Sequence, residues 1–124
     1  MIGGEASTDD PIRVCGVPGP NGELPVIDGA GATTRSSVQF PYEGHESRGV
    51  VVIGHPNDAP YEQMPGPIVL EGLAITGGRA DETFTNTSGA QEGYSDAVAG
   101  VFVQRGRGIT IRGCEIFGNA NGIF

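Results

Sequence analysis

The chain has 124 residues, 22 of them Gly and 9 Pro, and a formal net charge of −8. This length suffices for one domain with a core of its own but not for two. Its basic residues are seven arginines, with no lysine. Such an acidic chain disfavours nucleic acid and anionic membrane as partners, because both bind basic surfaces. Residues 1–13 lack the basic and apolar regions of a signal peptide, and no apolar run approaches the roughly 18 residues of a membrane-spanning helix.

The apolar residues favour β-strands. Ile and Val together number 21, against three Leu, and side chains branched at Cβ fit a pleated surface better than a helix. Short alternating segments are separated by Gly, Pro, Asn and Asp, which is typical of strands joined by turns. In chain order, we expect strands at residues 12–14, 26–27, 50–53, 68–75, 101–103 and 109–116, with another beginning at residue 123.

A gapless internal repeat is the most specific pattern. Residues 68–77 (IVLEGLAITG) align with residues 109–118 (ITIRGCEIFG) at an offset of 41. Each copy predicts two short strands hinged at a glycine, which is the unit that stacks into a β-solenoid. We expect inward-facing pairs at Ile68/Ile109, Leu70/Ile111, Leu73/Cys114 and Ile75/Ile116, with the alternate residues pointing outward.

The spacing of the other strands predicts where the chain leaves this repeat. The segments beginning at Gly100 and Gly122 are 22 residues apart, whereas those beginning at Gly49 and Gly100 are 51 residues apart. We expect the excess to form two loop insertions, at about residues 55–66 and 78–97. In stacked repeats, such insertions lie on one face and commonly build the binding surface.

The two cysteines predict no metal site. Cys15 and Cys114 are far apart in the chain, without His or Cys at zinc-ligand spacing. Cys114 replaces Leu73 in the repeat, which predicts a small side chain packed in the core. The Gly-Asn at residues 118–119 and the Asn-Gly at residues 121–122 are typical of corners between strands.

Three segments together resemble a known superfamily. Residues 10–29 (DPIRVCGVPGPNGELPVIDG), then PGPIVLEGLAITGG and GVFVQRGRGITIRGCEIFGNANGIF, resemble the right-handed parallel β-helix proteins similar to pectate lyase, among them the secreted repeat proteins that include chondroitinase B-like lyases. The resemblance implies a single all-β domain over residues 1–124, a right-handed parallel β-helix of about three coils. It also implies an extracellular location, and further coils, or a stacked copy, at the open ends.

The resemblance further implies an acidic polysaccharide as ligand. Similar lyases remove the proton beside a uronate carboxylate with a Lys or Arg base, while calcium or Arg neutralises the carboxylate. Arg recognises carboxylates bidentately and Tyr stacks on sugars, so the candidate substrate-binding residues are Arg79, Tyr94, Arg105 and Arg107. Calcium prefers several oxygen ligands, and the candidate ligands are Asp81, Glu82 and Asp96.

Two functions remain open from the sequence. One is a carbohydrate-active protein that binds or processes an acidic polysaccharide. The other is a non-catalytic stalk or adhesion element, because the given residues hold no convincing catalytic pair. His45 and Glu46 precede a core strand without a nucleophile or metal partner, which indicates a polar turn.

Overall fold

The structure is a computed structural model that describes residues 11–34, 44–54 and 66–124, and this part of the chain is all-β, without a helix. It contains eleven strands: β1 (Ile12–Cys15), β2 (Val26–Asp28), β3 (Gly49–Gly54), β4 (Ile68–Glu71), β5 (Ala74–Thr76), β6 (Thr83–Thr85), β7 (Gln91–Gly93), β8 (Ala99–Gln104), β9 (Ile109–Arg112), β10 (Glu115–Ile116) and β11 (Asn121–Ile123). All the strands expected from the sequence are present. β6 and β7 were not expected.

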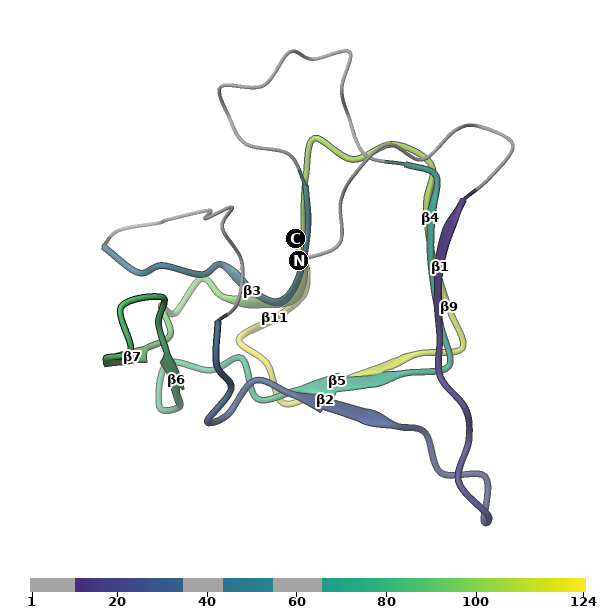
Figure 1. Cartoon of the computed structure of the whole chain (residues 1–124), viewed down its shortest axis with the longest axis horizontal. Coiled ribbons are helices and arrows are strands. Elements are labelled where there is room, and N and C mark those ends of the chain that lie inside the picture. Colours follow the sequence, from purple (N-terminus) through teal and green to yellow (C-terminus); the bar gives the residue numbers. More distant parts are fainter. Residues whose placement is uncertain (1–10, 35–43, 55–65) are drawn as a thin grey trace.

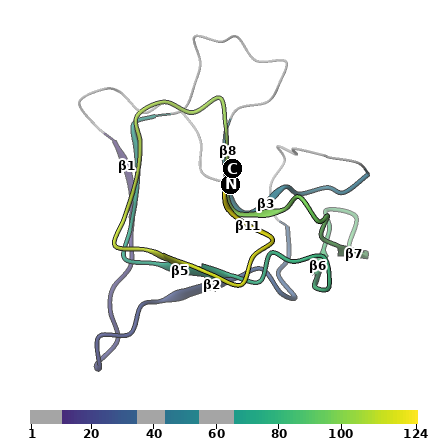
Figure 2. The same cartoon turned by 180° about the vertical axis from the view of Figure 1, so that it is seen from behind.

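Nine of the strands form three small parallel sheets, with the orders β1-β4-β9, β2-β5-β10 and β3-β8-β11. Each sheet takes one strand from each of three successive passes of the chain: β1 to β3, then β4, β5 and β8, then β9 to β11. Figures 1 and 2 show these passes lying over one another, with the strands of the three passes superimposed. The second pass supplies the middle strand of every sheet.

The internal repeat sets the register of two sheets. Ile68 pairs with Ile109 and Leu70 with Ile111 in parallel strands, and Ile75 pairs with Ile116. The predicted offset of 41 is therefore confirmed. The predicted spacing of 22 residues is also confirmed, because Ile123 pairs with Val101.

The expected alignment of Gly49 with Gly100 is wrong by one residue. Gly49 pairs with Ala99, and Val51 pairs with Val101, so the offset between β3 and β8 is 50. Matching the two glycines would place Val51 opposite Phe102. Val51 belongs to the main core, whereas Phe102 packs with Val52 in a separate cluster. A slip of one residue would exchange these two faces, and burial of the correct face decides the register.

The main core lies between the three sheets. Its buried members are Val51, Ile53, Ile68, Leu70, Leu73, Ile75 and Val101. Other inward residues of the first and third passes pack against this cluster but stay partly exposed, among them Cys114, whose predicted place beside the core is confirmed. Five of the seven buried members belong to the second pass, whose strands have a neighbour on both sides, and the other two, Val51 and Ile53, lie on β3.

Two glycines of the repeat make the turns between its strands. Gly72 and its equivalent Gly113 have φ values of +68° and +59°. Residues with a Cβ rarely adopt this left-handed conformation, so glycine permits β4 to turn into β5 and β9 to turn into β10.

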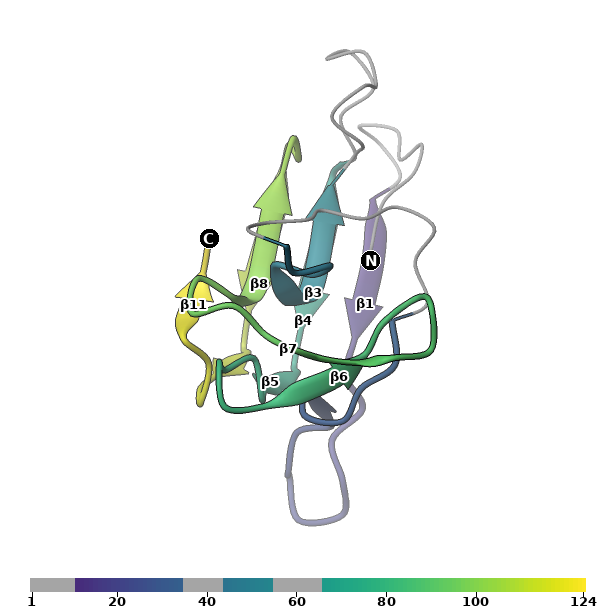
Figure 3. The same cartoon turned by 90° about the vertical axis from the view of Figure 1, so that its left-hand side faces the viewer.

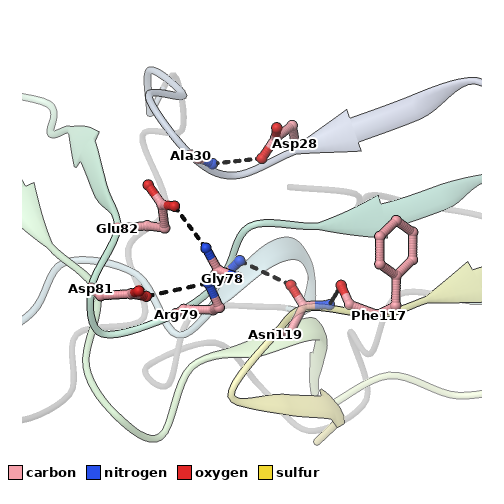
Figure 4. A network of polar contacts seen from close by, with 8 residues as sticks. All are labelled: Asp28, Ala30, Gly78, Arg79, Asp81, Glu82, Phe117 and Asn119. Carbon is pink, nitrogen blue, oxygen red and sulfur yellow. Dashed lines mark hydrogen bonds and ion pairs between the residues drawn. The ribbon is translucent and has the colours of Figure 1, made fainter.

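Asn119 joins the second and third passes at the next corner (Figure 4). Its Oδ1 accepts a hydrogen bond from the Gly78 backbone N–H at 2.9 Å. Its Nδ2 donates to the carbonyl oxygens of Ile75 and Phe117, each at 3.0 Å. One amide side chain thus satisfies three backbone groups where the strand ladders are interrupted.

Replacing Leu70 by Ala tests the core. Leu70 is fully buried, so we expect the free energy of unfolding to fall by roughly 2–5 kcal/mol. Thr110→Ala, on an exposed outward position of β9, is the control and should change it by less than about 0.5 kcal/mol. Chemical denaturation measures both values. Equal effects would contradict the assigned inward and outward faces.

Replacing Asn119 by Ala tests the corner. The change leaves the N–H of buried Gly78 without its acceptor, and we expect a loss of roughly 1–3 kcal/mol in unfolding free energy. Asn21→Ala in an exposed turn serves as the matched control. A melting temperature that is unchanged by Asn119→Ala would show that the amide does not stabilise this corner.

Candidate functional site

The insertion at residues 78–97 is an ordered hairpin. Strands β6 and β7 pair antiparallel, with Phe84 opposite Glu92. The turn between them is held by Asn86, whose Oδ1 accepts hydrogen bonds from the backbone N–H groups of Ser88 and Ala90, both at 3.0 Å. The sequence contained this signal, since Thr83 and Thr85 flank an apolar residue and the turn carries Asn and Gly.

The hairpin is fixed to two first-pass segments, as Figure 3 shows from the side. The Thr34 N–H donates to the Thr85 carbonyl oxygen at 2.8 Å. His45 Nδ1 lies 2.7 Å from the carbonyl oxygen of Gly93, which assigns the Nδ1 proton to this hydrogen bond. The Glu46 carboxylate accepts from the Thr87 N–H at 3.0 and 3.1 Å. His45 and Glu46 therefore anchor the hairpin.

Tyr94, an expected sugar-stacking residue, lies inside the protein. Only 5% of it is exposed, and it packs with Phe84 and Val98 in a small core under the hairpin. Its ring centroid is 4.7 Å from that of Phe84, and its hydroxyl donates to the Gly29 carbonyl oxygen at 2.8 Å. Burial, reinforced by the charge of Asp28, raises the pKa of Tyr94 to about 12. The side chain holds the hairpin and offers no open ring face to a ligand.

Arg79 is paired with two of the expected calcium ligands (Figure 4). Its guanidinium lies 2.9 Å from Glu82 Oε1 and 3.2 Å from Asp81 Oδ1. The hydrogen bond to Glu82, followed by the charge of Asp81, raises the pKa of Arg79. Arg79 and Asp81 are exposed and Glu82 is partly exposed, and the two carboxylates outnumber the one guanidinium, so the Arg79 charge is already used within the triad.

Asp96, the third expected calcium ligand, is exposed near the end of the insertion. Within the described residues, no three His, Cys, Asp or Glu side chains come together as a possible metal site. The structure therefore gives no support to the expected calcium site at Asp81, Glu82 and Asp96.

Arg105 and Arg107 lie on the turn that joins β8 to β9. Arg105 has φ of 57°, a left-handed conformation that is uncommon for a residue with a side chain. Arg107 is exposed and Arg105 is partly exposed. The turn leads directly into the β1-β4-β9 sheet, so both residues stand at one end of that sheet.

The outward side of the β1-β4-β9 sheet adds two more arginines. Arg13 and Arg112 are exposed and alternate with residues that pack against the core. Arg112 pairs with Glu71 of the neighbouring strand at 3.2 Å. We call this surface the arginine face, made of Arg13, Arg105, Arg107 and Arg112 together with Glu71.

The arginine face departs from the charge of the rest of the chain. It holds four of the six arginines in residues 11–34, 44–54 and 66–124, and one glutamate, which gives a formal charge of +3. The whole chain has a formal net charge of −8. Sequence reasoning named Arg105 and Arg107 but missed Arg13, because only the pairing of β1 with β4 places it on the same sheet as Arg112.

Comparison with protein-family models, with curated proteins and with solved structures finds no match to this chain. The part of the chain that the structure describes also has no helix long and apolar enough to cross a membrane.

The raised pKa of Tyr94 predicts a loss of stability at alkaline pH. The unfolded chain releases this proton near the ordinary value of 10.0, whereas the folded protein keeps it to about 12. Between these values the folded state binds more protons, so the free energy of unfolding falls as pH rises, by up to about 1.4 kcal/mol per pH unit.

The variant Tyr94→Phe isolates this effect. It should be less stable than the parent by about 1 kcal/mol at pH 7, because the hydrogen bond to Gly29 is lost. From pH 10 to pH 12 this difference should shrink to zero and then reverse sign, because the parent loses up to about 1.4 kcal/mol per pH unit and Tyr94→Phe does not. Denaturant titrations at several pH values measure it, and a constant difference would contradict the titration of Tyr94 in this range.

Proposed function

We propose that the three passes are consecutive coils of a right-handed parallel β-helix. Support comes from three parallel sheets that each take one strand per pass, around a shared apolar core. Parallel crossover connections are right-handed in the great majority of proteins. The hairpin at residues 78–97 is then an excursion from the second coil.

We propose further that the protein is extracellular and binds an acidic polysaccharide on the arginine face. The observation that carries this proposal is the gathering of Arg13, Arg105, Arg107 and Arg112 on one sheet and its entry turn, in an acidic chain. Guanidinium groups bind carboxylates through paired hydrogen bonds and remain charged at any physiological pH. A linear chain of uronates lying across the strands would meet several of them in succession.

Binding is better supported than cleavage. A lyase needs a side chain that is deprotonated before it takes the substrate's proton, and the lysine that serves as this base in similar lyases does not occur in the sequence. Arg79 is a poor base, because Glu82 and Asp81 raise its pKa above an already high value. The described residues thus supply guanidinium groups suited to recognising carboxylates.

The alternative function is a structural stalk or adhesion element. Ile123 and Phe124, at the end of the third pass, are 56% and 58% exposed, as suits a surface that packs against further protein. In this case the arginine face would be a solvated surface without a ligand.

A binding titration separates the two functions. We expect the chain to bind oligogalacturonate or a similar polyuronate, with an affinity that falls as ionic strength rises. The double variant Arg13→Gln/Arg107→Gln should weaken binding at least about tenfold, since two charge-assisted contacts are lost. Arg79→Gln is the matched control, because Arg79 lies outside the arginine face, and it should bind like the parent.

The comparison ligands are a neutral glucan and a single-stranded DNA of similar length. Binding of polyuronate but not glucan, weakened at least about tenfold by the double variant, supports the proposal. Equal binding of DNA would indicate a general polyanion surface. No binding of any polyuronate, with or without calcium, would remove the carbohydrate function and favour the stalk.

A further inference from the structure

The two ends of the strand stack carry an inference that is independent of polysaccharide binding. In all three sheets the first-pass strand lies at one edge and the third-pass strand at the other. Within the described residues, no strand pairs with the outer side of β1, β2 or β3, or with that of β9, β10 or β11. Unpaired strand edges are templates for pairing with another chain.

Exposed apolar side chains gather at these same two ends. Among the described residues, five large hydrophobic side chains are strongly exposed, and three of them belong to the third pass: Phe117, Ile123 and Phe124, at 53%, 56% and 58%. A fourth, Val26, lies on first-pass strand β2 and is 59% exposed. The fifth, Val17, lies on neither edge strand but in the connection from β1 to β2, and it is not part of either end.

In the β1-β4-β9 sheet, the unpaired backbone N–H and C=O groups on the outer side of β9 are spaced to pair with those on the outer side of β1. Gly108 and Arg112 accept hydrogen bonds from β4 and its flanking Gly72, so the alternate residues, Ile109 and Ile111, direct their backbone groups to the open side. At the other edge, Ile12 and Gly16 donate toward β4. Consequently Arg13 and Cys15 direct theirs outward.

Stacking a second copy continues this ladder. The register Ile12–Ile68–Ile109 places Ile12 of a second copy beside Ile109, which brings the outward groups of Arg13 against those of Ile109 and Ile111. The hydrogen bonds would then follow the pattern seen between β4 and β9. There Ile68 lies opposite Ile109, but its N–H donates to the carbonyl oxygen of the preceding residue, Gly108.

The β2-β5-β10 sheet gives the same result independently. Glu115 and Phe117 donate to the second pass, which leaves Ile116 directed to the open side. The carbonyl of Pro25 and the N–H of Gly29 are directed toward the second pass, so Val26 and Asp28 face outward. The register of this sheet places Val26 of a second copy beside Glu115. The outward backbone groups of Val26 and Asp28 then lie next to those of Ile116, as pairing requires.

The side chains at the two ends are also compatible. The observed registers would set Ile12 on Ile109, Val14 on Ile111, Ile27 on Ile116 and Val51 on Ile123, extending the apolar core. On the outward side, Arg13 would meet Thr110 and Cys15 would meet Arg112. No two like charges stand directly opposite each other in these rows.

We infer that the third-pass edge of one molecule docks on the first-pass edge of a second copy, head to tail, with strands parallel and in register. The two surfaces are different, so the contact is heterologous. Each new molecule leaves one free edge of each kind, and assembly can continue beyond a dimer.

Two charge substitutions test this inference. Ile123→Glu blocks the third-pass edge, and Val26→Glu blocks the first-pass edge by facing Glu115 of the neighbour. Both positions are more than half exposed in the single molecule, so the variants should fold, which circular dichroism checks. Val17→Glu, exposed but on neither edge strand, is the matched control.

Sedimentation velocity over a range of concentrations gives the readout. We expect the parent and Val17→Glu to form dimers and larger species, and each edge variant to associate at least about tenfold more weakly. An equimolar mixture of the two edge variants should form a one-to-one dimer and nothing larger, because only one intact pair of edges remains.

Three results would overturn the inference. A parent chain that stays monomeric at every concentration would show that the edges do not recognise each other. A mixture of folded edge variants that remains monomeric would show the same. Dimerisation of either edge variant by itself, to the extent seen for the parent, would indicate a symmetric contact elsewhere.

Discussion

The pairing of the second pass with a strand on each side is the constraint on which the rest of the structure depends. Leu70, Ile75 and Val101 are fully buried because parallel neighbours cover their strands on both sides. Their alternating partners point outward, and this alternation, together with the pairing of β1 and β9 with β4, carries Arg13 and Arg112 to one surface. The packing of the core and the position of the arginine face therefore both depend on the register of β1, β4 and β9. A slip of one residue would bury guanidinium groups and expose the core.

The hairpin at residues 78–97 illustrates how a polar insertion can be structural. Its polar groups are used internally: Asp81 and Glu82 pair with Arg79, and the turn amide of Asn86 satisfies backbone N–H groups. Its aromatic residues are buried against the first pass. The length and polarity of the segment suggested a binding loop, but its contacts join the second pass to the first. The candidate binding surface lies instead on a regular sheet.

Binding and assembly would reinforce each other. A head-to-tail stack extends the β1-β4-β9 sheet of one molecule into that of the next, so its outward arginines would form one longer surface. A polymeric ligand that spans several copies gains from effective concentration without any new contact. The stalk and the polysaccharide binder are then less opposed than the sequence suggests, since one fold would serve both.

The all-β class, the offset of 41 and the inward side chains of the repeat follow from the amino-acid pattern without knowledge of the fold. These depend on local alternation and on glycine turns, which backbone geometry imposes wherever they occur. Tertiary structure alone decided the pairing of Gly49 with Ala99, the burial of Tyr94 and the partners of Arg79. Such features depend on which segments meet across the fold. The alternating pattern decides on which face of a strand a side chain lies. The residues that it contacts across the fold depend on burial and charge pairing in the whole chain.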